Sequence, residues 1–200
     1  MQTMNITNAE YFTFNVDNSM LLVGMTGTGK SYLLDRLITD MVNAHKPNTL
    51  QFILLDMTYG NFGYLRKEKS EFVKSYENNP EKGLNILDDM AQLAKERSKS
   101  NSSQPLIFIC IEECDMAALD QARFDKAVMT INQNAKAANM KLVYSTSSPR
   151  VSVVSRELQD SFDLTLAGKL SSSYDYEMLG VPEPRPHDYY DFVVKQHTSN

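Results

Sequence analysis

Cysteine is scarce in this sequence, and its two cysteines, Cys110 and Cys114, lie in and just after one apolar segment. Neither belongs to a set of cysteines and histidines at the spacing of a zinc site. The pattern argues against a metal centre and against a disulfide framework. It predicts buried thiols in a reducing cytoplasm.

Long hydrophobic runs are also missing. No apolar segment is long enough to cross a bilayer, and the N-terminus lacks the pattern of a signal peptide. We therefore expect a soluble, cytoplasmic chain. It is either free-standing or a piece of a larger membrane-anchored protein that works at the cytoplasmic face of the membrane.

An excess of positive charge is the third absence. Lys and Arg total 20 against 25 Asp and Glu, so the net charge is −5. A nucleic-acid coat protein is usually basic, but a motor that touches DNA through a few loops need not be, so the charge argues only weakly against DNA. No internal repeat is visible. The 200 residues, 42% hydrophobic, suit one domain over 1–200, in which 1–18 form a lead-in strand and 181–200 an extension strand.

The sequence does contain a complete phosphate-loop motif between an apolar strand and an amphipathic helix. Gly24, Gly29, Lys30 and Ser31 match G-x-x-x-x-G-K-[ST] after the strand 20–23. Glycines let backbone N–H groups turn towards phosphate, Lys30 is expected to reach the β- and γ-phosphates, and Ser31 is expected to bind Mg²⁺. The residues that we assign to ATP binding in this stretch are Gly24, Met25, Thr26, Gly27, Thr28, Gly29, Lys30, Ser31 and Tyr32.

Apolar strands alternate with helical patterns along the chain, which predicts an α/β fold with a mainly parallel sheet and helices on both faces. The expected strands are 11–16, 20–23, 52–56, 106–111, 142–146, 164–170 and 189–194. The expected helices follow Lys30, begin near Asn79, fill most of 117–139 and span 174–179. Residues 57–72 are expected to be loop with at most a short helical turn.

Polar side chains end several of these strands, at the edge that also carries the phosphate loop. Glu112 and Glu113 follow the most hydrophobic strand, where ATPases place a Mg²⁺-side carboxylate and a water-activating carboxylate; we assign Glu112 to the metal and Glu113 to catalysis. Thr146 and Ser147 either sense the γ-phosphate or cap a turn. Asp56 is either a supporting residue of the site or a simple cap.

Two clusters of basic residues invite a DNA-binding interpretation, although a solvated basic face is the more frequent explanation. They comprise Arg66, Lys67 and Lys69, and Lys95, Arg97 and Lys99.

From about Ser19 onwards the chain resembles the ATPase motor domain of the FtsK/SpoIIIE DNA translocases. The matching segments are the phosphate loop 24–31, the strand 54–56 ending in Asp, the helix 85–99 with its Glu96-Arg97 pair, the strand and acidic tail 106–115, and the segments 135–142, 145–150 and 171–175. The resemblance implies a RecA-like P-loop fold, MgATP as ligand, and assembly into a ring, expected to be a hexamer, around a polymer.

The sequence also departs from the family pattern. Glu112-Glu113 stands where the family has Asp-Glu, Ser147 replaces a Gln, and the arginines expected near Thr165 and Glu177 are missing. Arg150 and Arg156 are the candidates that we assign to catalysis in place of those arginines, and Arg185 is a further one. Winged-helix and extra motor subdomains of the family are not found in this chain.

These features leave three interpretations open. The leading one is ATP-driven translocation of double-stranded DNA, in conjugation, plasmid or chromosome transfer, or viral genome packaging. The alternative is a domain like those of the type VII secretion ATPase EssC, which would bind a secreted protein and hydrolyse ATP weakly. The third is a nucleotide-gated binding module with little turnover.

Overall fold

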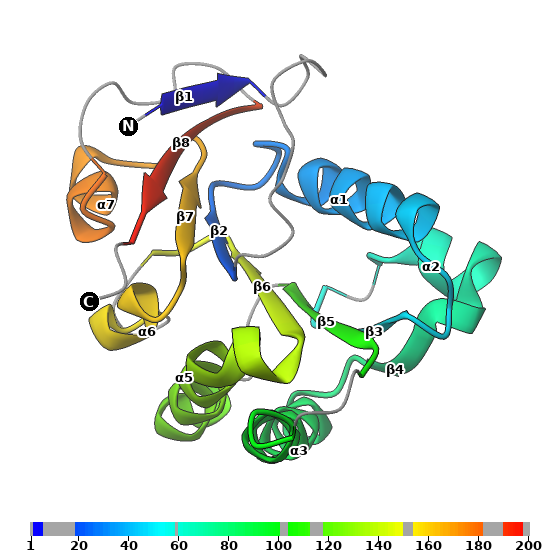
Figure 1. Ribbon diagram of the computed structural model, residues 1–200. Helices are drawn as coiled ribbons and strands as arrows, with labels where there is room; N and C mark the ends of the chain where they lie inside the picture. The colour runs from blue at the N-terminus through cyan, green and yellow to red at the C-terminus, as the bar shows by residue number, and fades with distance from the viewer. Residues whose placement is uncertain are drawn as a thin grey trace.

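The structure is a computed structural model that describes residues 2–5, 19–58, 60–100, 104–112, 118–149, 154–181 and 190–197. Its described strands form one eight-stranded sheet in the order β1-β8-β7-β2-β6-β5-β3-β4 (Figure 1). The strands are β1 (Gln2–Asn5), β2 (Met20–Val23), β3 (Leu50–Asp56), β4 (Val73–Glu77), β5 (Leu106–Glu112), β6 (Met140–Thr146), β7 (Leu164–Ala167) and β8 (Asp191–Gln196). From β7 to β4 all neighbours are parallel, whereas β8 runs antiparallel to both β7 and β1. The expected α/β class is confirmed.

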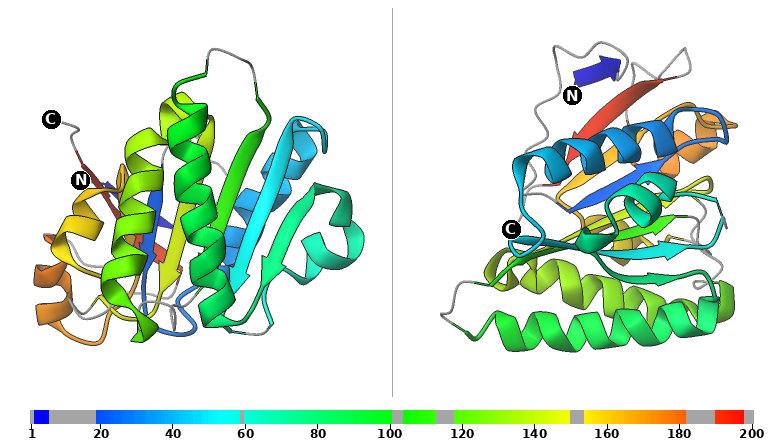
Figure 2. Two further views of the ribbon diagram at one scale, coloured as in Figure 1. Left: turned by 90° about the horizontal axis from the view of Figure 1, so that it is seen from below. Right: turned by 90° about the vertical axis from the view of Figure 1, so that its right-hand side faces the viewer.

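Helices cover both faces of the sheet. The helices are α1 (Lys30–Ala44), α2 (Gly63–Glu68), the 3₁₀ helix η2 (Ser70–Phe72), α3 (Pro80–Arg97), α5 (Gln121–Ala138), α6 (Arg156–Asp160) and α7 (Ser173–Met178). In Figure 2, α1 lies on one side of the sheet while α3 and α5 lie side by side on the other. The molecule is therefore a three-layered α/β domain.

Alternating strand residues supply two separate cores. On the α1 side, Met20 and Leu22 of β2 contact a stripe of buried α1 residues. That stripe is Leu33, Leu34, Leu37, Ile38, Met41 and Val42. Each such side chain gains roughly 1.5–3 kcal/mol from burial, which fixes α1 and the loop before it against the sheet.

On the opposite side, α3 and α5 pack against each other and against β5 and β6. The ring pair of Phe124 and Tyr144 joins α5 to β6 with centroids 5.4 Å apart. Asn79 starts α3 as expected, since its side chain accepts a hydrogen bond from the Lys82 N–H and Pro80 occupies the first turn.

The strand register brings the chemically important ends together. Asp56 is paired with Glu112, Glu112 with Ser145, and Val23 with Thr146. Because these strands are parallel, their carboxyl ends meet at one edge of the sheet, which is where ligands bind in open α/β folds.

Several elements differ from expectation. Strand β4 was not predicted, and residues 57–72 contain both α2 and η2 rather than one short turn. The last strand, predicted over 189–194, runs from Asp191 to Gln196. The predicted strand 11–16 lies outside the described residues.

Candidate nucleotide-binding site

The loop after β2 is held by backbone hydrogen bonds to its neighbours on both sides. The Gly24 N–H donates to the Thr146 carbonyl (3.2 Å) and the Met25 N–H to the Lys169 carbonyl (2.8 Å). At position 24 a Cβ atom would lie 2.6 Å from the Thr28 hydroxyl oxygen, so only glycine fits there. Gly27 and Gly29 have φ of 85° and 94°, in the left-handed region that glycine adopts without strain. The motif glycines therefore permit a tight turn.

Helix α1 begins at the end of this loop. Its N-cap residue, Gly29, offers no side-chain cap. The first N–H groups of a helix carry partial positive charge and are a ready site for phosphate oxygens. The loop and the start of α1 together form an anion-binding concavity.

Lys30 lies inside this concavity. Its side chain is buried, and its Nζ donates to the carbonyl oxygens of Gly24 (2.6 Å) and Met25 (3.4 Å). The ammonium group is therefore held within the loop, on the side where phosphates would sit. This placement agrees with the role predicted for it.

Ser31 and Glu112 meet across the cleft. The Ser31 hydroxyl donates to Glu112 Oε1 at 3.3 Å, and Glu112 is only 2% exposed. Mg²⁺ prefers oxygen ligands and keeps several waters, so one hydroxyl and one buried carboxylate next to a phosphate site suit it. The residues present fit the metal position predicted for them.

A third wall comes from the loop after β3. Asp56, fully buried, accepts hydrogen bonds from the Thr58 N–H (3.2 Å), the Thr58 hydroxyl (2.7 Å), the Asn61 N–H (3.0 Å) and the Tyr76 hydroxyl (3.2 Å). The Asn61 amide also donates to the Thr58 hydroxyl at 2.8 Å. Asp56 thus caps the turn after β3 and also organises the loop that supplies Thr58 and Asn61 to the cleft, so it combines features of both predicted roles.

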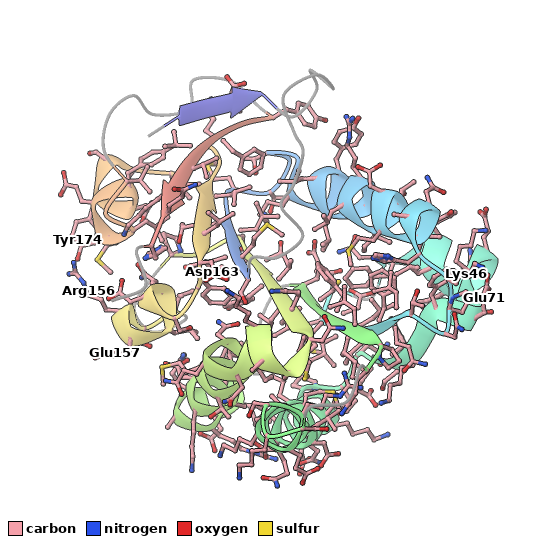
Figure 3. All side chains as sticks on the ribbon, in the orientation of Figure 1. Lys46, Glu71, Arg156, Glu157, Asp163 and Tyr174 are labelled. Atoms are coloured by element: carbon pink, nitrogen blue, oxygen red, sulfur yellow. The ribbon has the colours of Figure 1, made fainter. Side chains whose placement is uncertain are left out.

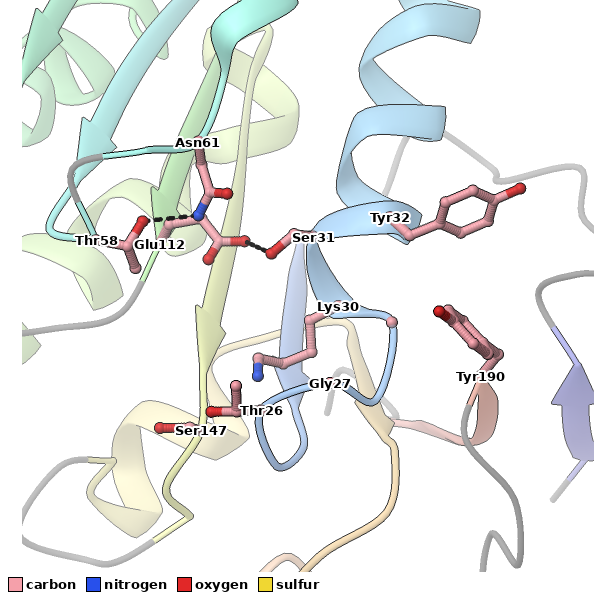
Figure 4. Close-up of a pocket in the computed structure, with 11 residues that line it drawn as sticks. Thr26, Gly27, Lys30, Ser31, Tyr32, Thr58, Asn61, Glu112, Ser147 and Tyr190 are labelled. Atoms are coloured by element: carbon pink, nitrogen blue, oxygen red, sulfur yellow. Dashed lines mark hydrogen bonds between the residues drawn. The ribbon is translucent and has the colours of Figure 1, made fainter.

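The fourth wall is aromatic. Tyr32 of α1 and Tyr190, just before β8, pack edge to face with ring centroids 6.0 Å apart. Tyr32 is 50% exposed, so it does not join the buried stripe of α1. In Figure 4 the two tyrosines lie together on the side of the first turn of α1 opposite to Lys30, and both line the cleft.

Together these walls enclose a cleft of about 420 Å³ (Figure 4). Its lining residues are Thr26, Gly27, Gly29, Lys30, Ser31, Tyr32, Thr58, Asn61, Glu112, Ser147 and Tyr190. Most of the predicted site is therefore brought together. Sequence reasoning missed Thr58, Asn61 and Tyr190, whose positions relative to the motif depend on the order of strands in the sheet.

Other predicted residues lie elsewhere. Gly24, Met25 and Thr28 shape the loop without lining the cleft. Thr146 is buried, and its hydroxyl accepts from the Ser148 N–H at 3.3 Å, which supports the turn-capping role for it. Arg156 opens α6 and is exposed outside the cleft, where it points away from the molecule (Figure 3).

Some predicted residues lie outside the described part of the chain. They are Glu113 and Arg150, which were assigned to catalysis, the further candidate Arg185, and Cys114. Cys110 is a buried free thiol, and burial raises its pKa well above the ordinary value, with the charge of Glu112 acting in the same direction. Within the part of the chain that the structure describes, no three metal-ligating side chains gather in one place.

One arginine of each predicted basic cluster contacts another part of the fold. The Arg66 guanidinium lies 3.7 Å from the ring centroid of Tyr76, and Arg97 donates to the Pro105 carbonyl at 2.8 Å. Burial lowers the pKa of Arg97. These two arginines therefore support the fold, whatever else they contact.

A phosphate loop at the carboxyl edge of a mainly parallel sheet, with a lysine in the loop and a serine paired to a strand-end carboxylate, defines a P-loop NTPase. A model of the FtsK/SpoIIIE family matches residues 2–151, three quarters of the chain, and the chain belongs to this family.

Curated relatives agree with this membership. The DNA translocase FtsK of Bacillus cereus is 24% identical over 182 residues, covering 78% of this chain and 23% of the relative. The DNA translocase FtsK of Streptococcus pyogenes is 23% identical over 194 residues, covering 84% of this chain and 24% of the relative. The chain thus spans about a quarter of the length of these relatives.

Solved structures share the fold. The pCW3 conjugation coupling protein TcpA, solved with ATPγS, superposes with a TM-score of 0.72 at 14% identity, over 92% of this chain and 59% of that one. ATPases 2 and 3 of EssC from Geobacillus thermodenitrificans give 0.68 at 16% identity, over 90% and 38%. The genome packaging NTPase B204 of Sulfolobus turreted icosahedral virus 2 gives a TM-score of 0.53 at 23% identity, over 83% of this chain and 81% of that one.

Among the described residues, no helix is long and apolar enough to cross a membrane.

Proposed function

We propose that this chain binds ATP with Mg²⁺ and hydrolyses it as the motor domain of a ring-shaped translocase. The observation that carries the proposal is the convergence, in one cleft, of the Lys30 ammonium, the start of α1 and the Ser31–Glu112 pair. A bound nucleoside triphosphate requires neutralisation of its charge, N–H donors for its phosphate oxygens and a position for the metal, and these groups supply all three.

Each residue then has a defined task. Lys30 and the loop N–H groups hold the β- and γ-phosphates, while Ser31 and Glu112 hold Mg²⁺, which supplies neutralisation of the charge on the phosphate oxygens. Glu113 is assigned the role of accepting a proton from the attacking water. Ser147 lines the cleft after β6, and we assign it a hydrogen bond to the γ-phosphate.

We propose double-stranded DNA as the polymer that is moved. Support comes from the curated relatives, which are DNA translocases, and from TcpA and B204, a conjugation coupling protein and a genome packaging NTPase. In this proposal the chain acts as a ring of copies, expected to be a hexamer, either alone or joined to further domains at a membrane.

Protein export is the second candidate. EssC, named above, and EccC are type VII secretion ATPases of the same fold. At the two places where the motor family supplies arginines, this chain has a buried threonine, Thr165, bonded to His197 at 2.9 Å, and an exposed glutamate, Glu177 on α7. Such a site favours a domain that binds nucleotide and substrate with slow hydrolysis.

Nucleotide binding is tested by calorimetric titration of MgATP into the chain and into Lys30→Ala. Hydrogen bonds to charged groups contribute about 1.5–3 kcal/mol, so we expect affinity to fall by about 10- to 100-fold or more. Circular dichroism should show an intact fold. Unchanged affinity in Lys30→Ala would refute the site.

The moved polymer is tested by measuring the ATPase rate with and without double-stranded DNA. Strong stimulation by DNA, absent in Lys30→Ala, is the result expected of a DNA motor. No stimulation by DNA, together with binding of a secreted protein's signal peptide, would transfer the assignment to export.

A further inference from the structure

Tyr190 has an unusual backbone. Its φ is 70°, in the left-handed region that a bulky side chain rarely adopts. Its N–H donates to the carbonyl of Thr28 in the phosphate loop at 3.1 Å. Strained backbones persist where the surroundings enforce them, often at functional sites, and here the strain places one aromatic ring beside the phosphate loop.

The ring is also unusually accessible for an aromatic side chain. Tyr190 is 39% exposed and Tyr32 50%, and both line the cleft while touching each other edge to face. They come from the start of α1 and from the segment before β8, which are far apart in the sequence. An exposed aromatic pair at the wall of a cleft offers a flat ligand a surface for stacking.

The cleft therefore has two ends of different chemistry. Figure 4 shows Lys30 and the Ser31–Glu112 pair on one side of the first turn of α1, and the two tyrosines on the other side. A nucleotide is polarised in the same way, with a charged triphosphate at one end and a planar base at the other. The size of the cleft, about 420 Å³, falls within the usual range for a small-molecule site.

We propose that Tyr190 and Tyr32 form the base-binding end of this site and select a nucleoside triphosphate, with purines preferred, over a bare polyphosphate. This proposal rests on the proposed function. Purines are preferred because their larger ring system covers more of a tyrosine face.

The test compares a ligand that carries a base with one that does not. MgATP, MgCTP and magnesium tripolyphosphate are titrated into the 200-residue chain and its variants by calorimetry. Tyr190→Gly removes the ring and is compatible with the positive φ, so a loss of affinity does not arise from added backbone strain. Tyr32→Ala removes the second ring with a residue that suits a helix.

We expect Tyr190→Gly and Tyr32→Ala each to weaken ATP binding by roughly 5- to 100-fold, the range for one lost base–aromatic stack. Tripolyphosphate affinity should stay within about twofold, because the phosphate end is untouched. The preference for ATP over CTP should shrink in both variants. Tyr190→Phe, which keeps the ring, should bind ATP like the parent.

Tyr174→Ala on α7 is the matched control. That tyrosine is 65% exposed, points outward at a site remote from the cleft (Figure 3) and should not affect any of the three ligands. Equal losses for ATP and tripolyphosphate in Tyr190→Gly would show that the ring only braces the phosphate loop, and would overturn the proposal. ATP affinity unchanged in both tyrosine variants would overturn it too.

A different set of results would refute the proposed function itself. If the parent chain bound neither ATP nor tripolyphosphate, and Lys30→Ala changed nothing, the nucleotide site itself would be wrong and the base-binding end with it. If tripolyphosphate binds through Lys30 but ATP gains nothing from the tyrosines, only the base-binding proposal fails.

Discussion

Glu112 is a carboxylate that the fold buries almost completely at the mouth of a phosphate-binding loop. Burying a charge costs several kcal/mol unless partners compensate, and the Ser31 hydroxyl at 3.3 Å is one such partner. A divalent cation next to both oxygens would offset that cost. The proposed metal role of Glu112 is therefore tested directly.

Glu112→Gln keeps an oxygen that can accept from Ser31 and removes only the charge. We expect the gain in ATP affinity on adding Mg²⁺ to fall by at least about tenfold, while ATP affinity in EDTA stays the same. Calorimetric titrations with Mg²⁺ and with EDTA measure both quantities. A parent-like response to Mg²⁺ would remove Glu112 from the metal site.

Glu113→Gln is the neighbouring comparison. If Glu113 accepts the proton from water, this variant should bind MgATP normally and hydrolyse it about 10²–10⁴-fold more slowly. Exchanged phenotypes between positions 112 and 113 would show that the two roles are reversed. Equal and mild effects at both positions would favour a binding module with little turnover.

His197 gives the chain a pH-dependent term in its stability. Burial and the charge of Lys195 lower its pKa, and they outweigh Asp160 and Asp163, which act in the opposite direction. The imidazole of His197 therefore binds a proton more readily in the unfolded chain than in the folded chain. Stability conferred by neutral His197 is present above the unfolded pKa of about 6.5 and is lost as the pH falls below it.

Between about pH 7.5 and pH 5, we expect the free energy of unfolding to fall less in His197→Gln than in the parent. Urea unfolding at the two pH values measures this difference. A parent-like slope in His197→Gln would show that other groups dominate.

At the scale of elements, the loop between β3 and α2 depends on one buried carboxylate. Asp56 accepts four hydrogen bonds, two on each oxygen, and Asp56→Asn can accept them on one oxygen only. The bonds to the Asn61 N–H and the Tyr76 hydroxyl would be lost or rearranged, which displaces the loop that carries Thr58 and Asn61. We expect weaker ATP binding and a lower unfolding midpoint.

Tyr76→Phe separates these two effects, because it removes the bond from β4 and leaves the bonds of Thr58 and Asn61 to Asp56 in place. A hydrogen bond to a charged group contributes about 1.5–3 kcal/mol, so urea unfolding should show a loss of that order while ATP affinity changes little. Asp89→Asn, on the exposed side of α3, should change neither. If Asp56→Asn binds ATP as the parent does, the loop plays no part in the site.

The elements that could be predicted from the sequence are those with a strong local pattern. Strand β5 is a continuous apolar run, and α3 combines apolar periodicity with an Asn-Pro start. Strand β4 is polar and lies at the sheet edge, so it is a strand only because β3 pairs with it. No local pattern marks such a strand.

The same division applies to the site. Gly24 to Ser31 is one contiguous motif and could be read directly. Thr58, Asn61 and Tyr190 reach the cleft through the order of strands, which single-sequence patterns do not specify. Tyr32 was assigned to nucleotide binding from its place beside the motif, and its exposure is seen only in the structure.

In the whole molecule, β2 lies at the centre of the sheet between β6 and β7. The segment of the chain that connects β6 to β7 carries two arginines, Arg150 and Arg156. Arg150 follows β6 outside the described residues, and Arg156 opens α6, exposed and away from its own cleft. An arginine in that position is remote from its own site, and we propose that it serves the site of a neighbouring copy in a ring. Such an arginine finger can raise the hydrolysis rate by roughly 10³–10⁵.

If the active form is a ring with a finger supplied by the neighbour, the specific ATPase activity should rise with protein concentration as copies associate. Arg150→Ala and Arg156→Ala should each be tested, and the variant lacking the finger should bind ATP normally but hydrolyse it slowly. Mixing that variant with Glu113→Gln should restore activity, because an interface that combines the intact glutamate of one copy with the intact arginine of the other forms one complete site. Glu157→Ala, next to Arg156 and also exposed, is the control and should behave like the parent. Activity that is independent of concentration, with no recovery in any mixture, would mean that each copy hydrolyses ATP without a neighbour.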